Sequence, residues 1–229
     1  MKTVGIIGGL GPETTAQFYL KVVFSSYQKN KQLRPAMLVW NVPLPYKIEE
    51  EFITKSQGEE KYLPFLIDAA QRLEKGGADF IVIPCNSVHI YIENVRKAVD
   101  IPVLSIIDET ITFLKKQNIK DVGILATSAT IRKKLYEEKL LINNIKVETP
   151  DENIQSRMGG IINHLVHSQQ TEKDKSELIK IIKTLVQKNV KTIILACTDL
   201  QLLVPKYKDI KIYDSMEILV DATVKELLS

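Results

Sequence analysis

The stretch Asp79-Phe80-Ile81-Val82-Ile83-Pro84-Cys85-Asn86 has a counterpart later in the chain, Lys191-Thr192-Ile193-Ile194-Leu195-Ala196-Cys197-Thr198. Each stretch is a run of mostly apolar residues that reaches a cysteine, and a small amide or hydroxyl residue follows. A continuous apolar run that ends in small polar residues indicates a buried strand of a parallel sheet, with its last residues at a site. The two stretches contain the only cysteines of the chain.

The repetition extends upstream and downstream of the two cysteines. Cys85 lies 81 positions after Val4 in Val4-Gly5-Ile6-Ile7, and Cys197 lies 75 positions after Val122 in Val122-Gly123-Ile124-Leu125. A further apolar stretch follows each cysteine, at 101–105 and at 210–215. This pattern indicates an internal duplication. If the two halves face each other, we expect the two thiols to meet across one cleft.

Composition excludes several classes of protein. The chain has 229 residues, of which 45% are hydrophobic, and its formal net charge is +3 with the lysines spread along the sequence. This indicates one large or two ordinary globular domains with a solvated surface, and gives no support for nucleic-acid binding. No apolar run reaches the ~18 residues that a membrane span needs. The N-terminus has no signal-peptide pattern, so we expect a cytoplasmic protein with reduced thiols.

Alternation of strands and helices predicts an α/β protein of two pseudo-symmetric domains, each a parallel sheet flanked by helices. Sites of such sheets lie beyond the carboxyl ends of the strands, where both cysteines are expected. We expect the first domain to comprise residues 1–103 and 214–229, and the second 104–213. The reason is that the last helix, at 215–228, follows a strand equivalent to that at 101–106 and can pack back on the first half.

A glycine-rich turn, Gly8-Gly9-Leu10-Gly11-Pro12-Glu13-Thr14-Thr15, opens the first helix. It resembles a dinucleotide-binding loop, but Thr14 stands where the third glycine belongs, and the next strand ends in Asn41 rather than in an acidic residue. The turn is therefore expected to be a tight strand-to-helix connection whose backbone N–H groups can meet a carboxylate. After the second strand, residues 48–57 are predicted to form a short polar helix or lid.

Two facing cysteines are compatible with several roles. Cys85, His89 and Cys197 could bind a metal, but no second Cys or His lies near Cys197, and His89 is expected instead to orient a neighbour. A regulatory disulfide lacks the C-x-x-C spacing of redox motifs. Two buried, inert cysteines are the structural alternative.

Proton transfer is the role that the quasi-symmetric placement favours. A stereocentre is inverted most simply when a base removes a proton from one face and an acid delivers one to the other. Both cysteines precede a predicted helical segment, whose dipole is expected to favour the thiolate. Asn86 and Thr198, one residue further on, could bind a substrate carboxylate and stabilise the carbanion.

Three stretches together resemble the signatures of the aspartate/glutamate racemase family. These are the glycine turn at 8–15, Pro84-Cys85-Asn86-Ser87-Val88-His89, and Ala196-Cys197-Thr198-Asp199-Leu200. The resemblance covers essentially the whole chain. It implies two-cysteine enzymes of two pseudo-symmetric α/β domains that act on a small amino-acid substrate without pyridoxal phosphate, another cofactor or a metal. It also implies an active site in the cleft between the domains and a homodimer, while the composition already gave no reason to expect a nucleic-acid or membrane partner.

The resemblance assigns Cys85 and Cys197 as the catalytic acid/base pair. The substrate-binding residues that it implies are Leu10, Lys47, Asn86, Ser87, Thr127, His167, Thr198 and Asp199. Lys47 and His167 stand where aspartate-specific members have cations for the distal carboxylate, and Asp199 stands where the family usually has Glu.

The sequence therefore predicts racemisation of L- and D-aspartate, with glutamate or a broader acidic range next. Relatives with other activities also use cysteines at these positions: maleate isomerase, hydantoin racemase and arylmalonate decarboxylase. The presence of both cysteines disfavours the decarboxylase, which needs only one. A small-molecule-binding or regulatory protein with inert cysteines is the alternative from another class.

Overall fold

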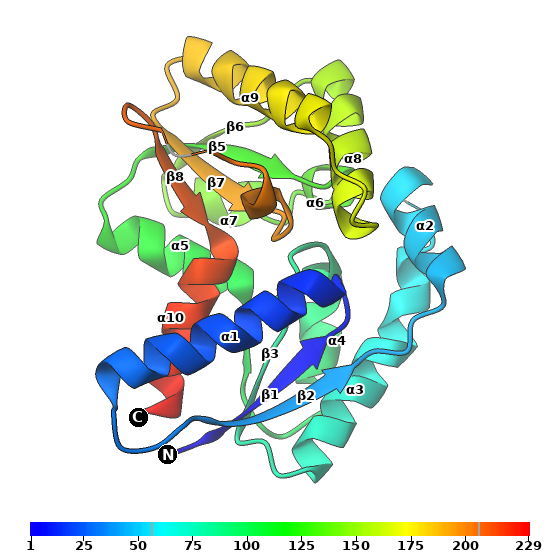
Figure 1. The fold of residues 1–229 in the computed structure, drawn as a ribbon, viewed down its shortest axis with the longest axis vertical. Coiled ribbons are helices and arrows are strands. Elements are labelled where there is room, and N and C mark those ends of the chain that lie inside the picture. Colours follow the sequence, from blue (N-terminus) through cyan, green and yellow to red (C-terminus); the bar gives the residue numbers. More distant parts are fainter. Residues whose placement is uncertain (56, 206) are drawn as a thin grey trace.

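Two four-stranded parallel sheets form the framework of the protein in a computed structural model that describes residues 1–55, 57–205 and 207–229. Their strand orders are β2-β1-β3-β4 and β6-β5-β7-β8, the same order in each half (Figure 1). The first sheet contains β1 (Thr3–Gly8), β2 (Ala36–Asn41), β3 (Phe80–Val82) and β4 (Val103–Leu104). The second contains β5 (Asp121–Ala126), β6 (Lys146–Glu148), β7 (Thr192–Ala196) and β8 (Lys211–Asp214). The predicted two-sheet α/β fold is thus confirmed.

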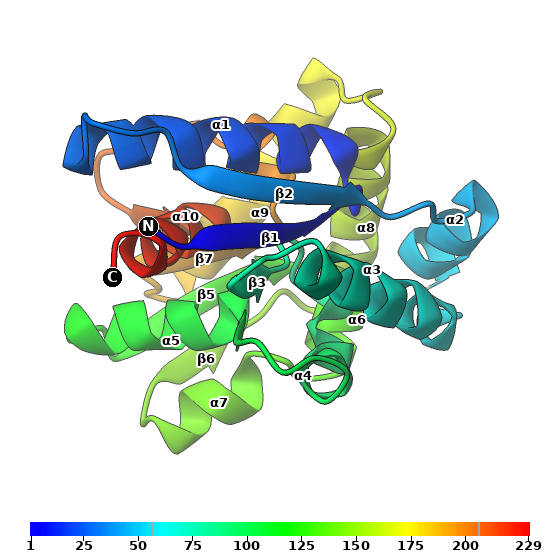
Figure 2. The same ribbon diagram turned by 90° about the horizontal axis from the view of Figure 1, so that it is seen from below.

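Helices cover both faces of the sheets. The first half contains α1 (Pro12–Lys29), α2 (Tyr46–Lys55), α3 (Leu63–Lys75), α4 (Ile92–Arg96) and the 3-10 segments η1 (Glu59–Tyr62) and η2 (Ser87–Tyr91). The remainder contains α5 (Ile106–Lys116), α6 (Ser128–Arg132), α7 (Glu137–Ile142), α8 (Glu152–Val166), α9 (Glu172–Gln187), η3 (Leu200–Leu202) and α10 (Ser215–Leu227). Figure 2 shows α1 and α3 on opposite sides of β1 and β2. Over the described residues, no helix has the length and apolar character that a membrane crossing requires.

Several elements differ from the sequence-based expectation. The residues after Thr127 were expected to form one helix that ends near Leu141, but this helix is interrupted, because Lys134 adopts a left-handed conformation with φ 51° and the Leu135 N–H bonds to the Thr130 carbonyl. This is the hydrogen-bond pattern of a Schellman helix end, and it separates α6 from α7. The helix expected after Cys85 begins as the 3-10 segment η2. Ser56, inside the helix expected at 48–57, lies outside the described residues.

One of the apolar clusters among the described residues joins the two halves through α5 and α10. It contains Ile6 and Val82 of the first sheet, Ile124 and Ile194 of the second, and Leu219 of α10, all at most 1% exposed. Helix α10 leaves the second sheet and packs against α1 and α5 (Figure 1). The Lys2 N–H also bonds to the carbonyl of Leu227 at 3.2 Å. Because this core is shared, packing alone does not divide the chain, and the predicted domain boundaries stay a prediction.

The shared core predicts a stability difference between two leucines. Leu219 is fully buried between the halves, whereas Leu141 on α7 is 62% exposed. Leu219→Ala removes buried methyl groups and leaves a cavity, which should lower the free energy of unfolding by about 2–5 kcal/mol. Leu141→Ala should change it by less than ~0.5 kcal/mol. Urea unfolding of the two variants measures the difference, and equal losses would contradict a shared core at Leu219.

Candidate active site

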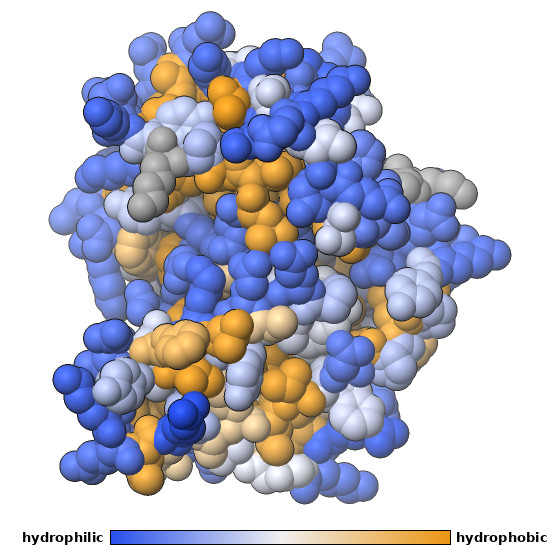
Figure 3. Space-filling model, in the orientation of Figure 1, coloured by the Kyte–Doolittle hydropathy of each residue, from blue (hydrophilic) through white to orange (hydrophobic). Residues whose placement is uncertain are grey.

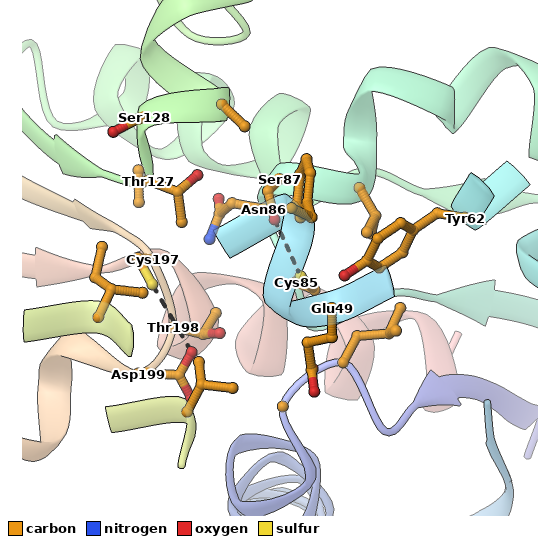
Figure 4. Close-up of a pocket in the computed structure, with 18 residues that line it drawn as sticks. Glu49, Tyr62, Cys85, Asn86, Ser87, Thr127, Ser128, Cys197, Thr198 and Asp199 are labelled. Carbon is orange, nitrogen blue, oxygen red and sulfur yellow. Dashed lines mark hydrogen bonds between the residues drawn. The ribbon is translucent and has the colours of Figure 1, made fainter. Parts of the chain in front are cut away.

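A pocket lies at the carboxyl ends of the central strands of both sheets (Figure 4). Eight of the ten site residues predicted from the sequence line it: Leu10, Cys85, Asn86, Ser87, Thr127, Cys197, Thr198 and Asp199. The remaining lining residues within the described parts of the chain are Gly11, Glu49, Phe52, Tyr62, Val88, Ser128, Ala129, Ile162, Val166 and Ala196. The two free thiols of the chain therefore line one pocket.

Cys85 follows the short strand β3 and is partly exposed to the pocket. Its sulfur lies 3.6 Å from the Ser87 hydroxyl. Burial raises the pKa of the Cys85 thiol to about 11, although the Ser87 hydroxyl and the backbone N–H of Val88 act in the opposite direction. These groups favour the thiolate because they can donate hydrogen bonds to it.

Cys197 follows β7 and is 6% exposed. Its sulfur lies 3.8 Å from Oδ2 of Asp199, and Oδ1 of the same carboxylate accepts a hydrogen bond from the Thr14 hydroxyl. Burial raises the pKa of Cys197 well above its ordinary value, and the charge of Asp199 raises it further. Asp199 thus favours the protonated thiol, whereas Ser87 favours the thiolate of Cys85.

The close approach of Asp199 depends on the glycine turn. Gly11 has φ 25°, and a Cβ placed there would lie 3.0 Å from Oδ1 of Asp199. A larger residue would therefore push against the carboxylate that contacts Cys197. This turn connects β1 to α1 as expected, and its tightness brings the first half against the residues that follow β7.

Backbone N–H groups at the starts of the segments after the cysteines lower the pKa of both thiols, as expected, but burial outweighs this effect. The segments that follow the cysteines are the short 3-10 segments η2 and η3, which align few peptide dipoles. Desolvation is the largest influence on the pKa of each thiol, and it favours the neutral form. Both cysteines are therefore protonated near neutral pH in this structure.

Asn86 is held by groups from the other half of the molecule. Its Nδ2 donates to the Ser215 hydroxyl at 3.0 Å, and its Oδ1 accepts from the Tyr136 hydroxyl at 2.6 Å. Ser215 in turn donates to the Leu195 carbonyl at 2.8 Å. The second N–H of the amide has no hydrogen bond among the described groups and can meet a substrate carboxylate. Sequence reasoning missed Tyr136 and Ser215, because nothing local in their stretches marks them as partners of Asn86.

Two threonines bring hydroxyl groups to the same region. Thr127 caps α6, and its hydroxyl accepts from the Thr130 N–H at 3.2 Å. The Thr198 hydroxyl donates to the Pro84 carbonyl at 3.4 Å, across the boundary between the halves. Together with Asn86 and Ser87, these groups form a polar wall beside the thiols.

His89 is buried behind Cys85. Its Nδ1 lies 2.7 Å from the Cys85 carbonyl, which accepts the N–H, and its Nε2 accepts from the Ile106 N–H at 3.1 Å. Burial lowers the pKa of His89 to about 4, so the imidazole is neutral. Both ring nitrogens are occupied, and it positions the backbone of Cys85, the orienting role expected for it. Within the described residues, no three His, Cys, Asp or Glu side chains are grouped as a metal site requires.

The two residues expected to bind a distal carboxylate are not where that role requires them. Lys47 and His167 are exposed, and neither lines the pocket. His167 follows the last residue of α8, and its ring folds back so that the Asn163 carbonyl accepts from Nδ1 at 2.8 Å. Lys47 lies in the first turn of α2, whereas Glu49, two residues further, lines the pocket instead. Sequence reasoning missed Glu49, although the segment that carries it was expected to be a short polar helix or lid.

Comparison with known proteins agrees with this geometry. Residues 7–223 match the family model described as Asp/Glu/Hydantoin racemase. The chain is 30% identical over 237 residues to the broad-specificity amino-acid racemase RacX of Bacillus subtilis (strain 168), covering 99% of this chain and 98% of that protein.

Two solved structures are also similar over nearly the whole chain. One is the aspartate racemase of Picrophilus torridus, with 28% identity, a TM-score of 0.83, and 99% and 94% of the two chains covered. The other is an aspartate racemase homologue from Pyrococcus horikoshii OT3, with 27% identity, a TM-score of 0.80 and full coverage of both chains.

The fold and the paired-cysteine pocket thus define a two-domain racemase of the α/β class. The chain belongs to the Asp/Glu/hydantoin racemase family, and the protein is an amino-acid racemase, an isomerase.

The surroundings of the thiols predict how Cys85 titrates. In a Cys197→Ala variant, the ultraviolet absorbance of the Cys85 thiolate should increase with pH. The midpoint of this increase should equal the pKa of Cys85, which is about 11. An unperturbed cysteine would reach its midpoint at pH ~8.5. A midpoint at or below that ordinary value would contradict the dominance of burial at Cys85.

A second titration tests how the Asp199 carboxylate affects the pKa of Cys197. In a Cys85→Ala background, Asp199→Asn removes a negative charge 3.8 Å from the sulfur and should lower the pKa of Cys197. The same ultraviolet titration measures the shift, with Glu50→Gln as a control at an exposed carboxylate. An unchanged Cys197 midpoint would show that Asp199 does not act on the thiol.

Proposed function

We propose that this enzyme racemises a free α-amino acid by direct proton transfer, with Cys85 and Cys197 as the two acid/base groups. The observation that carries the proposal is the pair of thiols from equivalent strands that line one pocket beside an amide and three hydroxyl groups. One thiolate removes the α-proton and becomes a thiol. The other thiol gives its proton to the opposite face and becomes a thiolate. The chain's own groups suffice for this step, so we propose that no cofactor or metal takes part.

The two cysteines are not equivalent, and their neighbours support an assignment of the first proton transfer. Ser87 favours ionisation of Cys85, whereas Asp199 keeps the proton on Cys197. Starting from the state in which both thiols are protonated, Cys85 is therefore the thiol that ionises and removes the α-proton, and Cys197 is the acid that donates a proton. The reverse reaction starts from the opposite distribution of one proton between the two sulfurs.

Ionisation of Cys85 needs an opposing charge, because the thiol is protonated near neutral pH. The α-ammonium group of the substrate can supply it when the substrate displaces water from the pocket. The polar wall of Asn86, Ser87, Thr127 and Thr198 is placed to bind the α-carboxylate. Negative charge moves onto this carboxylate as the α-proton leaves, so hydrogen bonds from the wall strengthen towards the transition state.

Aspartate is one candidate substrate. The structural similarity to the Picrophilus torridus aspartate racemase supports it, and so does the sequence-based expectation. The described lining of the pocket contains no cationic residue to pair with the side-chain carboxylate of aspartate, because Lys47 and His167 do not belong to it. Glutamate is a second candidate, because the sequence-based expectation and the family description both include it. The family description also includes hydantoin, so a hydantoin racemase is the alternative within the family.

The assay that tests the proposal is circular dichroism of single enantiomers over a panel of amino acids and 5-substituted hydantoins. The protein is first freed of small molecules by gel filtration in EDTA, and no pyridoxal phosphate is added. Loss of optical activity for at least one amino acid supports the proposal. Activity on hydantoins alone, or activity that requires an added cofactor, would overturn it.

The two-base mechanism predicts the behaviour of the single cysteine variants. Cys85→Ala and Cys197→Ala should each lower racemisation by at least about 10³-fold, because inversion needs a proton donor on each face. Each variant can still exchange the α-proton of one enantiomer with deuterium, since one base remains. Proton NMR in D₂O measures this exchange. Cys85→Ser is the conservative control, and wild-type racemisation by either alanine variant would rule out two bases.

The expected homodimer remains part of the proposal. Exposed apolar side chains of α1 and β2 include Leu20, Phe24, Tyr27 and Val39. Figure 3 shows apolar side chains gathered on the face of the molecule where Figure 1 places these two elements. An exposed patch of this kind is typical of a protein interface. Light scattering should give twice the chain mass for the wild type and a smaller mass for Phe24→Glu. A wild-type monomer at micromolar concentration would contradict the dimer.

A further inference from the structure

The helix α2 places an acidic side chain over the pocket. Helix α2 belongs to the first half but packs against α8 and α6 of the second, so it covers the opening between the halves. Glu49 lies in its first turn, is half-buried and lines the pocket. Figure 4 shows its carboxylate beside the region between Cys85 and Asp199.

The Glu49 carboxylate has no hydrogen bond or salt bridge to any residue whose side chain is described. Burial raises its pKa, and the exposed His167 offsets this effect only in part. A carboxylate that loses hydration without gaining a partner is unfavourable, and a cation brought to it by a ligand removes this penalty.

The charges around Glu49 favour such a cation. Asp199 is the second carboxylate of the pocket, and it also raises the pKa of Glu49 through like-charge repulsion. Neither Lys nor Arg occurs among the described lining residues. A substrate with an acidic side chain would add a third negative charge to this wall, whereas one with a basic side chain would add a compensating positive charge.

The two carboxylates differ in their availability to a substrate side chain. Asp199 already accepts from Thr14 and contacts the Cys197 thiol, so it belongs to the reacting end. Glu49 has no such contact. In Figure 4 it lies on the opposite side of the thiols from Asn86, Ser87 and Thr127, which belong to the polar wall proposed to bind the α-carboxylate. A substrate that places its α-carbon between the sulfurs therefore extends its side chain towards Glu49.

Apolar side chains line much of the pocket that contains Glu49. Phe52 and Tyr62 line it with their ring centroids 5.0 Å apart, and Leu10 and Val166 also contribute. The Tyr62 hydroxyl points into the pocket as well (Figure 4). A largely apolar pocket with an unpaired carboxylate matches an aliphatic side chain that ends in a positive charge. Lysine, ornithine and arginine have this chemistry.

We propose that Glu49 is a specificity-determining residue that selects amino acids with a cationic side chain over acidic ones. This inference rests on the proposed racemase function and deepens it by naming the substrate class. It replaces the expectation of an acidic substrate, because the residue that α2 directs into the pocket is Glu49 rather than Lys47.

The test compares lysine with norleucine, which has a neutral side chain of similar length. The wild type should have a higher kcat/KM for lysine than for norleucine and for aspartate. Glu49→Gln keeps the shape but removes the charge, and should lower kcat/KM for lysine by about 10- to 100-fold, the size of a hydrogen bond to a charged group. Norleucine should change by less than about 3-fold.

Two further variants complete the design. Glu50→Gln removes an exposed carboxylate from the same helix and serves as the matched control, with the lysine-to-norleucine ratio unchanged. Glu49→Lys should reverse the preference and raise kcat/KM for aspartate. A thermal unfolding curve for each variant shows that it is folded.

The outcomes separate this inference from the proposed function. If the wild type racemises amino acids but prefers aspartate, or if Glu49→Gln lowers lysine and norleucine equally, Glu49 does not select the side chain and the inference fails. An equal loss would place Glu49 at the α-ammonium group instead. If no amino acid is racemised under any condition, the proposed function itself fails.

Discussion

The apolar core that α5 and α10 share between the two sheets is the constraint on which the site depends. Each helix follows the last strand of its own sheet, and α10 packs against α1 of the other half. This packing fixes the carboxyl ends of β3 and β7 around one pocket, so that Cys85 and Cys197 reach it from opposite halves. The hydrogen bonds from Tyr136 and Ser215 to Asn86 cross the same boundary and hold the polar wall in place.

The packing that brings the two thiols into one pocket also buries them, and burial keeps them protonated. Desolvation raises the pKa of both cysteines, while their nearest polar neighbours act in opposite directions: a hydroxyl donor beside Cys85 and a carboxylate beside Cys197. A quasi-symmetric fold therefore carries two thiols in asymmetric surroundings, which we propose to be the acid/base pair. Proton transfer in both directions requires this asymmetry to be small in the substrate complex, and the charges of the substrate itself can reduce it.

Much of the fold and the centre of the site could be predicted from the sequence. Buried parallel strands are continuous apolar runs, and the duplicated run with a terminal cysteine marks the equivalent strands of both halves. The polar residues directly after those strands, together with Leu10 and Thr127 after the first strand of each half, were found because strand ends converge at one edge of a parallel sheet. These are local signals, since each residue takes its place from the strand that it follows.

The sequence by itself determined the two-sheet architecture, the family and the paired thiols, because hydrophobic pattern and motif spacing specify them. The tertiary structure alone decided which side chains of α2 and α8 face the pocket. A helix turns by about 100° per residue, so a shift of two positions exchanges Lys47 for Glu49 and reverses the charge of the wall. Only the tertiary structure could also show that Tyr136 and Ser215 contact Asn86, because residues distant in the sequence meet through packing that leaves no local pattern.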